Sequence, residues 1–595
     1  MNVNYEIKSL DYVELKNQTK LPSFQRSVVW SSEKRKELIH TIQDGYPFGS
    51  LLLHETLGAE KKYLLVDGLQ RLSTIMDYEK NKYAYIDIQS FAKEYFEEIY
   101  ALYESRVEAS LSDSVKNKIM DIVVNAFKRK TTESGVTFIT RELVTEMPTF
   151  DSFQLDVMEI IEKIDSRITN YIDLDKLRVP VVIFKGDASE LPNIFESINS
   201  GGTKLSKYEI FASAWQGIVF KIDDATILRW VDEKYEKMQE KSGLEIENYT
   251  PGSIAESGEI NLFEYAYAIG KIIRNDYVEM FAGKNSSDAS EIDAIGFGLL
   301  AAALGVDIKK MGNIANHFRV NMDPKNLIDM KDKLVECSRE VNDILKKYIK
   351  SVDNKVFTKY MYHQVVSIVA SLFKIKYSVG ADLKISTNHG STRHVRSFER
   401  HMPKHYLYDL IRGFWAGSGD TKIAELLRQD IEKNKYIDGI SDEWWTSALE
   451  EWMGEQEKKE SRNIDIVNKL FLTYMFNLTN PAATTNKYDF EHIIPQNRFE
   501  RRFGKGPFSA VGNLCILPLF ENRSKKEKTL YEYFDETLST GNINEAEIQN
   551  NYYYPQRSEI DFIKGDSFTK DAYARFLRER HYYLSRKFIE LISRL

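Results

Sequence analysis

The chain is poor in cysteine, with only Cys337 and Cys515 among its 595 residues, and the two are far apart. Neither belongs to a metal-type cysteine pair, which argues against a disulfide framework or a zinc ribbon. The first ten residues lack the charged region and apolar run of a signal peptide. The longest apolar stretch, 292–304, contains Asp293 and is too short to span a bilayer. These absences predict a cytoplasmic protein with no membrane partner.

An excess of positive charge is also missing, because the formal net charge is −8 at pH 7. Binding to DNA would therefore need a local basic face. The sequence has no G-x-x-x-x-G-K-S/T motif, which excludes a P-loop NTPase. A hydrophobic content of 43% and a charged content of 29% are typical of globular proteins. The length predicts about three or four domains.

The first part of the chain alternates short apolar runs with helical spacing of apolar residues, which favours an α/β domain. The expected strands are 49–53, 63–67 and 179–184, and the expected helices are 33–43 and 69–79. Residues 91–170 are predicted to be a largely helical insertion in this domain.

The remainder is expected to contain a helical region and then a second mixed region. Helical patterns cover 262–273, 330–349 and 360–377, and short strands return after residue 475, before a final helix over 570–595. We therefore predict a multidomain α/β plus α protein. Its domains would be 1–215, 216–475 as a helical coupling region, and 476–595.

Residues suited to phosphodiester hydrolysis gather in the C-terminal region, in the order strand, loop, strand, helix. Glu491 and His492 end the first strand, Asn513 opens the second, and Asn522 precedes the helix. A neutral imidazole can take a proton from water, so His492 is the predicted base. Carboxylate and amide oxygens suit Mg²⁺ or Mn²⁺, so Glu491 and Asn522 are the predicted metal ligands. Asn513 would pin the loop and orient the imidazole by a hydrogen bond.

This segment resembles the HNH endonucleases of the ββα-metal class, in the branch with the pattern E/D-H-I-x-P, G-N-L-x-L-L and N-x-x-x-K. The matching residues are Glu491, His492, Pro495, Gly512, Asn513, Leu514, Asn522 and Lys526. Asn522 stands in place of the histidine of the third letter, which favours Mg²⁺ over tightly bound zinc. The alternative is that the Glu-His pair is a plain polar strand end.

Basic residues surround the motif and would contact the DNA backbone, as the resemblance implies. The alternative is a solvated charged face, as most charge runs are. The residues concerned are Arg498, Arg501, Arg502, Lys505, Arg523, Lys525 and Lys526.

A second motif lies at the junction of the expected strand 63–67 and the expected helix 69–79. Gly68 permits a sharp turn, and the start of the helix offers free N–H groups to an anion. Arg71 can fork onto a phosphate with Gln70 donating beside it, while Asp67 can hold a metal or a ribose or polarise water. The alternative is an ordinary strand-turn-helix with a surface arginine. Upstream, Gln25 and Arg26 form another Gln-Arg pair that could join the same pocket.

The N-terminal pattern resembles the "Q-R … W … D-G-Q-Q-R" domain with a ParB/sulfiredoxin-like core, found in the GmrSD family of modification-dependent restriction enzymes and related phage-defence nucleases. Further matches are Trp30 and the segments 46–50 and 194–205. The resemblance implies that a nucleoside triphosphate binds and is hydrolysed here, with Asp67 and Arg71 as the catalytic pair, and that this controls cleavage by the HNH domain. Leu69 replaces the first Gln of the motif. If that Gln contacts nucleotide or water, hydrolysis is weaker here; if it faces the core, nothing changes.

Two further segments carry residue types that could form sites. The four histidines between 389 and 405 have irregular spacing, and a polar loop beside helices is favoured over a metal site. The segment 413–419 combines Phe414 and Trp415 with three glycines. It could clamp a flipped base, but a turn between packed helices is the commoner use of such a segment.

The sequence thus predicts an endonuclease or nickase that acts on double-stranded DNA, carrying a chemical modification, in defence against phage or other foreign DNA. The alternative is a nucleotide-regulated DNA-binding or toxin-like interaction protein with an inactive HNH domain. The oligomeric state stays open, a homo-oligomer included.

Overall fold

The computed structural model describes residues 5–25, 28–56, 61–130, 135–187, 190–191, 194, 207–276, 289–318, 323–349, 359, 361–480, 488–518, 527–537 and 545–595. The chain divides into two compact units. Unit 1 comprises Met1–Gln216 with Val231–Ser257, and unit 2 comprises Gly217–Trp230 with Gly258–Leu595. Among the described helices, none is both long and apolar enough to cross a membrane.

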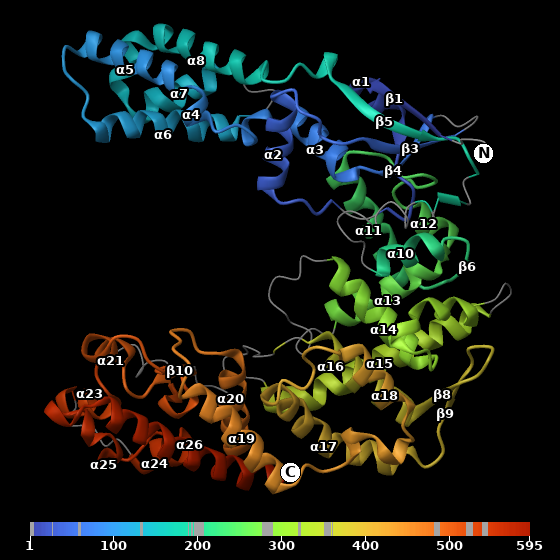
Figure 1. The fold of residues 1–595 in the computed structure, drawn as a ribbon, viewed down its shortest axis with the longest axis vertical. Coiled ribbons are helices and arrows are strands. Elements are labelled where there is room, and N and C mark those ends of the chain that lie inside the picture. Colours follow the sequence, from blue (N-terminus) through green and yellow to red (C-terminus); the bar gives the residue numbers. More distant parts are fainter. Residues whose placement is uncertain are drawn as a thin grey trace. The chain divides into compact units, whose positions relative to one another are not determined.

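Unit 1 is built on a five-stranded mixed sheet with strand order β1-β5-β3-β4-β2 (Figure 1). The pairs β3·β5 and β2·β4 are parallel, and β1·β5 and β3·β4 are antiparallel. Its elements are β1 (Tyr5–Asp11), α1 (Tyr12–Gln18), β2 (Thr19–Lys20), α2 (Ser32–Gln43), β3 (Leu51–Glu55), β4 (Tyr63–Asp67), α3 (Leu69–Lys80) and β5 (Arg178–Phe184), followed by α10 (Lys207–Ala214), the part of α11 (Ala225–Ser242) from Val231 onward, and α12 (Ser253–Ser257).

The burial of the strands follows their apolar patterns. The first four residues of both β3 and β4 are buried, as expected for near-continuous apolar runs in the middle of a sheet. The edge strand β1 instead alternates exposed and half-buried residues, with charges at Glu6 and Lys8. The expected strands and both expected helices of this domain are confirmed to within a few residues.

A helical insertion interrupts the sheet between α3 and β5, as predicted (Figure 1). It has its own apolar core, because α6 and α8 each bury one stripe at helical spacing, such as Ile119, Val123 and Phe127 on α6. Its helices are α4 (Ile88–Phe91), α5 (Lys93–Val107), α6 (Asp113–Arg129), α7 (Thr137–Glu146) and α8 (Gln154–Thr169).

Unit 2 is mostly helical, as expected for residues after 216, and ends in a small mixed region. Helix α16 is buried along almost its whole length and packs against α14, α15, α17 and α18. The helical elements are α13 (Leu262–Asp276), α14 (Ala289–Ala303), α15 (Pro324–Ile349), α16 (Tyr362–Lys376), α17 (Ser391–Ile411), α18 (Gly419–Arg428), α19 (Asp442–Gln456) and α20 (Ile466–Thr479), with the two-stranded pairs β6 (Val219–Lys221)·β7 (Glu259–Asn261) and β8 (Tyr377–Val379)·β9 (Ile385–Thr387).

The C-terminal part of unit 2 contains the antiparallel pair β10 (Tyr488–His492) and β11 (Leu514–Pro518), with α21 (Gln496–Phe503) in the connection between them. The two expected strands are present, the helix expected directly after Asn522 begins outside the described residues, and the next described helix is α23 (Leu530–Thr537). The chain then continues through α24 (Glu545–Asn551), α25 (Arg557–Ile560) and α26 (Lys570–Ser593). Helix α26 packs on α19, α20 and the turn Val511–Asn513, so the helices support the strand pair.

Candidate functional site

The β10·β11 pair places the predicted base at the end of a strand. Glu491 pairs with Cys515 and His492 with Leu514 in the antiparallel register. Both Glu491 and His492 are half-buried, whereas Ile493 and Ile494, which follow them, are fully buried. Apolar anchoring directly after the strand fixes the backbone of the Glu-His pair and leaves both side chains within reach of solvent.

The imidazole of His492 is held by a serine that sequence reasoning missed. Nε2 of His492 lies 3.3 Å from Oγ of Ser509, and this hydroxyl donates to the carbonyl of Arg462 at 3.0 Å. Ser509 is 5% exposed. It lies between α21 and β11 and outside the residues that matched the motif, so its only sequence signal is its place just before Gly512 and Asn513.

Asn513 is fully buried and pins the loop, as predicted. Its Oδ1 accepts from the N–H of Ile494 at 2.9 Å, and its Nδ2 donates to the carbonyls of Ile494 and Phe508 at 3.1 and 2.9 Å. The carboxamide of Asn513 does not make the expected direct hydrogen bond to the imidazole, because its oxygen and nitrogen bond backbone groups instead. It acts on His492 through the loop, whereas Ser509 contacts the ring itself.

Of the two predicted metal ligands, Glu491 is described, and Asn522 lies outside the described residues. Among the residues that the structure describes, no group of three or more His, Cys, Asp or Glu side chains could hold a metal ion. The two predicted ligands, Glu491 and Asn522, would both offer oxygen donors. That donor chemistry suits Mg²⁺ or Mn²⁺ better than Zn²⁺.

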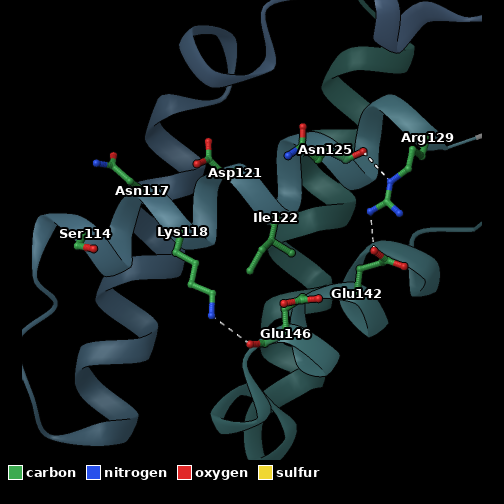
Figure 2. A pocket seen from close by; sticks show the side chains of 9 residues that line it. All are labelled: Ser114, Asn117, Lys118, Asp121, Ile122, Asn125, Arg129, Glu142 and Glu146. Carbon is green, nitrogen blue, oxygen red and sulfur yellow. Dashed lines mark hydrogen bonds and ion pairs between the residues drawn. The ribbon is translucent and has the colours of Figure 1, made fainter. Parts of the chain in front are cut away.

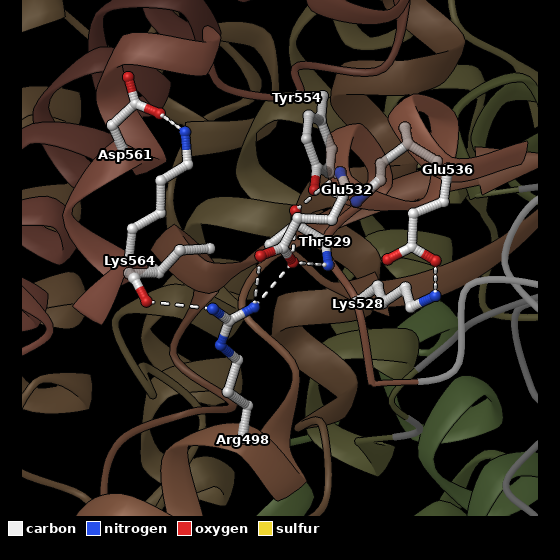
Figure 3. A network of polar contacts seen from close by, with 10 residues as sticks. Arg498, Lys528, Thr529, Glu532, Glu536, Tyr554, Asp561 and Lys564 are labelled. Atoms are coloured by element: carbon white, nitrogen blue, oxygen red, sulfur yellow. Dashed lines mark hydrogen bonds and ion pairs between the residues drawn. The ribbon is translucent and has the colours of Figure 1, made fainter. Parts of the chain in front are cut away.

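Arg498, a predicted DNA contact, is bound within the protein (Figure 3). Its Nη1 lies 2.8 and 2.7 Å from the two carboxylate oxygens of Glu532, and its Nη2 donates to the carbonyl of Ile563 at 3.0 Å. Burial raises the pKa of Glu532, but hydrogen bonds from Arg498 and Thr529 outweigh burial, so the net pKa is lowered. The pair joins α21 to α23, and this guanidinium therefore has a structural role.

The other described basic residues are more exposed. Arg501 pairs with Glu527 at 2.7 Å with its side chain 71% exposed. Arg502 donates to the carbonyl of Gly565, and Lys505 is exposed in the loop after α21. These three side chains are accessible to a phosphate. The predicted contacts Arg523, Lys525 and Lys526 lie outside the described residues.

In unit 1, the predicted strand-turn-helix is present, and Gly68 begins α3 with a left-handed φ of 100°. Arg71 Nη2 lies 2.9 Å from Oδ2 of Asp67 and donates to the carbonyl of Ser50 at 3.0 Å. A Cβ on Gly68 would lie 2.3 Å from Cδ2 of Leu51, and a Cβ on Gly49 would lie 3.0 Å from Nη1 of Arg71. Both glycines are thus needed for the guanidinium to lie close to the backbone.

The hydrogen-bond donors around Arg71 are of the kinds that bind an anion. The Nε of Arg71 is buried and has no hydrogen-bond partner among the residues described here. The Arg71 side chain is 23% exposed, so other N–H groups of its guanidinium can reach a phosphate oxygen. The backbone N–H groups at the start of α3 add a favourable dipole. The residues present therefore fit a nucleotide phosphate.

The two predicted glutamines serve mainly to hold the fold. Gln25 is 5% exposed and donates to the carbonyls of Leu65 and Val66 at 2.9 and 3.2 Å. Gln70 is 4% exposed, and its Oε1 accepts from the N–H groups of Val29 and Trp30 at 2.8 and 3.0 Å. These two bonds fix the oxygen end of the carboxamide, and the expected donation from its nitrogen to a phosphate stays a prediction. Arg26 and residues 195–205 of the second matching segment lie outside the described residues.

Leu69, which stands where the motif has Gln, is 2% exposed. The side chain at this first position of α3 faces the core of unit 1, where leucine is at least as favourable as glutamine. Of the two readings of this departure, the structure thus favours the one in which the Leu leaves the chemistry unchanged.

The remaining segments singled out in the sequence are largely structural. Trp415 is 2% exposed and its indole donates to Asp409 at 2.7 Å, so it is a core residue, while Phe414 is 39% exposed. His405 is 8% exposed, and its Nε2 lies 3.0 Å from the carbonyl of Asp438. Burial lowers the pKa of His405 to about 3, which keeps this ring neutral.

A wide polar groove of about 680 Å³ lies between α6 and α7 in the helical insertion (Figure 2). Lys118 and Arg129 reach across it to α7 and bond to the carbonyl of Glu146 and the carboxylate of Glu142. None of the predicted site residues lines this groove.

The N-terminal part of the chain is similar to a known protein family. Residues 9–216 match the family model of the GmrSD restriction endonuclease N-terminal domain. This match supports the GmrSD resemblance and with it a restriction endonuclease type of defence function. The matched residues include Gln25, Asp67 and Arg71, and the match ends before the β10·β11 pair. No curated protein and no solved structure matches the chain.

Proposed function

We propose that this chain is a metal-dependent DNA endonuclease, with an HNH-type site on the β10·β11 pair and a GmrSD-type N-terminal domain that binds a nucleoside triphosphate and controls cleavage. The observation that carries the proposal is the placement of His492. Its half-buried imidazole ends a strand directly after a carboxylate, and its backbone is fixed by the fully buried Asn513. The N-terminal match supports the type of enzyme.

In the proposed reaction, the imidazole of His492 accepts a proton from the water that attacks the phosphodiester. Imidazole side chains exchange a proton near neutral pH, which suits a base at physiological pH. Ser509 holds the ring, and Asn513 fixes the loop behind it. Glu491 and Asn522 would hold Mg²⁺ or Mn²⁺, which when bound offsets negative charge on the phosphate and the leaving oxygen.

The proposed substrate is double-stranded DNA that carries a chemical modification and enters from outside, such as phage DNA. Arg501, Arg502 and Lys505 are accessible, and with Arg523, Lys525 and Lys526 they would bind the DNA backbone. In the N-terminal domain, Arg71 and the start of α3 would bind the phosphates of the nucleotide, and Asp67 would act in its hydrolysis. The ParB/sulfiredoxin-like and ββα-metal folds are part of this proposal.

A plasmid relaxation assay with Mg²⁺ tests the nuclease. We expect the purified chain to nick plasmid or modified DNA, and His492→Ala to reduce the rate about 10²- to 10⁴-fold, the usual contribution of a general base. The matched control is His389→Ala, because His389 is an exposed histidine in the same unit and should not matter. Equal cleavage by His492→Ala and the control would refute the mechanism.

The same assay separates the endonuclease from a nucleotide-regulated binding protein with an inactive HNH domain. Such a protein would turn over nucleotide in a manner sensitive to Asp67→Ala and would break no strand with any metal. A panel of plain and modified DNAs, each with and without nucleotide, would identify the substrate and the direction of the control.

A further inference from the structure

We propose that Ser509 is a positioning residue that sets the tautomer of His492. Helices α19 and α20 in turn fix the position and orientation of Ser509. The effect of Ser509 on cleavage rests on the proposed nuclease function, but its effect on the tautomer of His492 does not. The hydrogen-bond geometry from which it starts is a property of the folded chain.

The tautomer follows from the single hydrogen of the serine hydroxyl. Ser509 Oγ lies 3.0 Å from the carbonyl of Arg462 and 3.3 Å from Nε2 of His492. A carbonyl oxygen can only accept, so the shorter contact takes the hydroxyl hydrogen. The serine oxygen must then accept from the ring, which places a hydrogen on Nε2. In the neutral ring the lone pair consequently lies on Nδ1, which becomes the basic atom.

The serine itself is fixed by helices that precede the strand pair in sequence. Nδ2 of Asn468, on α20, donates to the carbonyl of Ser509 at 2.9 Å and to Oε1 of Gln456 at 2.8 Å. That oxygen of Gln456, the last residue of α19, also accepts from the N–H of Val511 at 2.9 Å. Asn468 is 3% exposed, so water competes little for these bonds.

The acceptor of the hydroxyl hydrogen comes from the same source, since Arg462 lies between α19 and α20. Two helices and the segment that joins them therefore determine both the position of Ser509 and the direction of its hydrogen. Any shift of α19 against α20 would reorient the proposed base. The helical part of unit 2 thus has a physical route by which it could control cleavage.

The tautomer can be measured directly on the full chain labelled with ¹⁵N-histidine. At a pH where the ring is neutral and without added metal, long-range ¹H–¹⁵N spectra distinguish protonated Nε2 from protonated Nδ1. The signals of His492 are assigned by their loss in His492→Gln. We expect protonated Nε2 in the unchanged chain and in Ser509→Thr, which keeps the hydroxyl, and a mixture of tautomers in Ser509→Ala.

Activity provides the second readout. Removing a residue that orients a functional group typically costs about 10- to 100-fold, so we expect a loss of this size in the nicking rate of Ser509→Ala and recovery of most of the rate in Ser509→Thr. The control is Ser378→Ala, because Ser378 is exposed on β8 and its hydroxyl contacts Ser386 rather than the strand pair. If Ser509→Ala does not fold, Ser509→Cys, a near-isosteric replacement with a much weaker acceptor, replaces it in both measurements.

The outcomes separate this inference from the proposed function. Protonated Nδ1 in the unchanged chain, or an unaltered tautomer in Ser509→Ala, would overturn the inference whatever the activity. The expected tautomers in a chain that cuts no DNA would leave the role of Ser509 standing and refute the nuclease.

Discussion

The two candidate sites differ in how many of their polar motif residues bond the protein's own backbone and how many stay accessible to a ligand. In the N-terminal site, Gln25 and Gln70 are almost fully buried and bind backbone groups, and Arg71 is shared between Asp67 and the carbonyl of Ser50. At the C-terminal site, the buried Asn513 and Asn468 hold the loop, and Glu491 and His492 are left half-buried. The first motif therefore consists mostly of scaffold, whereas the second separates scaffold from chemistry.

The difference follows from the local backbone. A turn from a strand into a helix leaves N–H and carbonyl groups without partners, and side chains of the motif must satisfy them. An antiparallel strand pair satisfies its own backbone, so the supporting carboxamides of Asn513, Asn468 and Gln456 bond the loop beside it. A motif residue next to a turn is thus more often structural than one at the end of a paired strand. The following predictions test that contrast, from the largest expected effect to the smallest.

Asn513→Ala should lower the free energy of unfolding of unit 2 by about 3 to 4 kcal/mol, because an N–H and two carbonyls lose buried partners. Chemical denaturation followed by tryptophan fluorescence measures the change. The control is Asn497→Ala, since Asn497 is exposed on α21 and should have an effect near zero. Similar unfolding of the two variants would show that Asn513 is not the scaffold of this site.

Gly68→Ala should destabilise unit 1 by about 2 to 3 kcal/mol, because a left-handed φ disfavours a side chain and the new Cβ would meet Leu51. Gly45→Ala separates the two causes: Gly45 has a φ of 75° but open space around it. We expect this control to cost about 1 kcal/mol, from strain alone. Equal losses in thermal unfolding would mean that Leu51 moves aside and that the glycine is not needed for packing.

Much of the fold could be predicted from the sequence where the apolar pattern is regular. The buried runs at 63–67 and 179–184 and the helical patterns at 69–79 and 570–595 correspond to β4, β5, α3 and α26. The return of Val231–Ser257 to unit 1 could not be predicted, because it depends on contacts between distant residues and leaves no local signature. An example is the carboxylate of Glu245, which pairs with Lys20 and Lys61.

At the two sites, the sequence predicted which residues are important more accurately than it predicted the role of each residue. The motif predicted that Asn513 pins the loop, but not that its partners are backbone groups, and it gave no sign of Ser509. Residue type alone could not tell that the oxygen of Gln70 binds the segment at Val29 and Trp30. A glutamine that donates to a phosphate and one that accepts from a backbone are the same letter in the sequence.

Gln70→Ala should destabilise unit 1 by about 2 kcal/mol, because two backbone N–H groups lose their acceptor. Gln70→Glu keeps an acceptor at the same position and should recover most of that loss. Nucleotide binding measured by calorimetry on both variants decides between scaffold and ligand contact. A large loss of affinity in the uncharged Gln70→Ala, beyond its loss of stability, would show that the side chain contacts the nucleotide, and the contrast between the two sites would fail.

Arg498→Ala and Arg501→Ala should have opposite effects on stability and DNA binding, although the two residues are neighbours on α21. Arg498 joins α21 to α23 through Glu532, so its loss should cost about 1 to 2 kcal/mol, whereas exposed Arg501 should contribute less than about 0.5 kcal/mol. The lowered pKa of Glu532 makes its stabilisation fully present above its ordinary value of 4.5 and lost as the pH falls through the lower folded value. Arg498→Ala should therefore differ from the unchanged chain less at low pH than at pH 7, in denaturation curves taken at both values.

In DNA titrations at increasing salt, Arg501→Ala should reduce the salt dependence by about one ion, as expected for a lost phosphate contact. Arg498→Ala should leave the salt dependence unchanged. A reduced salt dependence in Arg498→Ala would show that this arginine exchanges Glu532 for DNA and that the C-terminal site does not keep scaffold and chemistry apart.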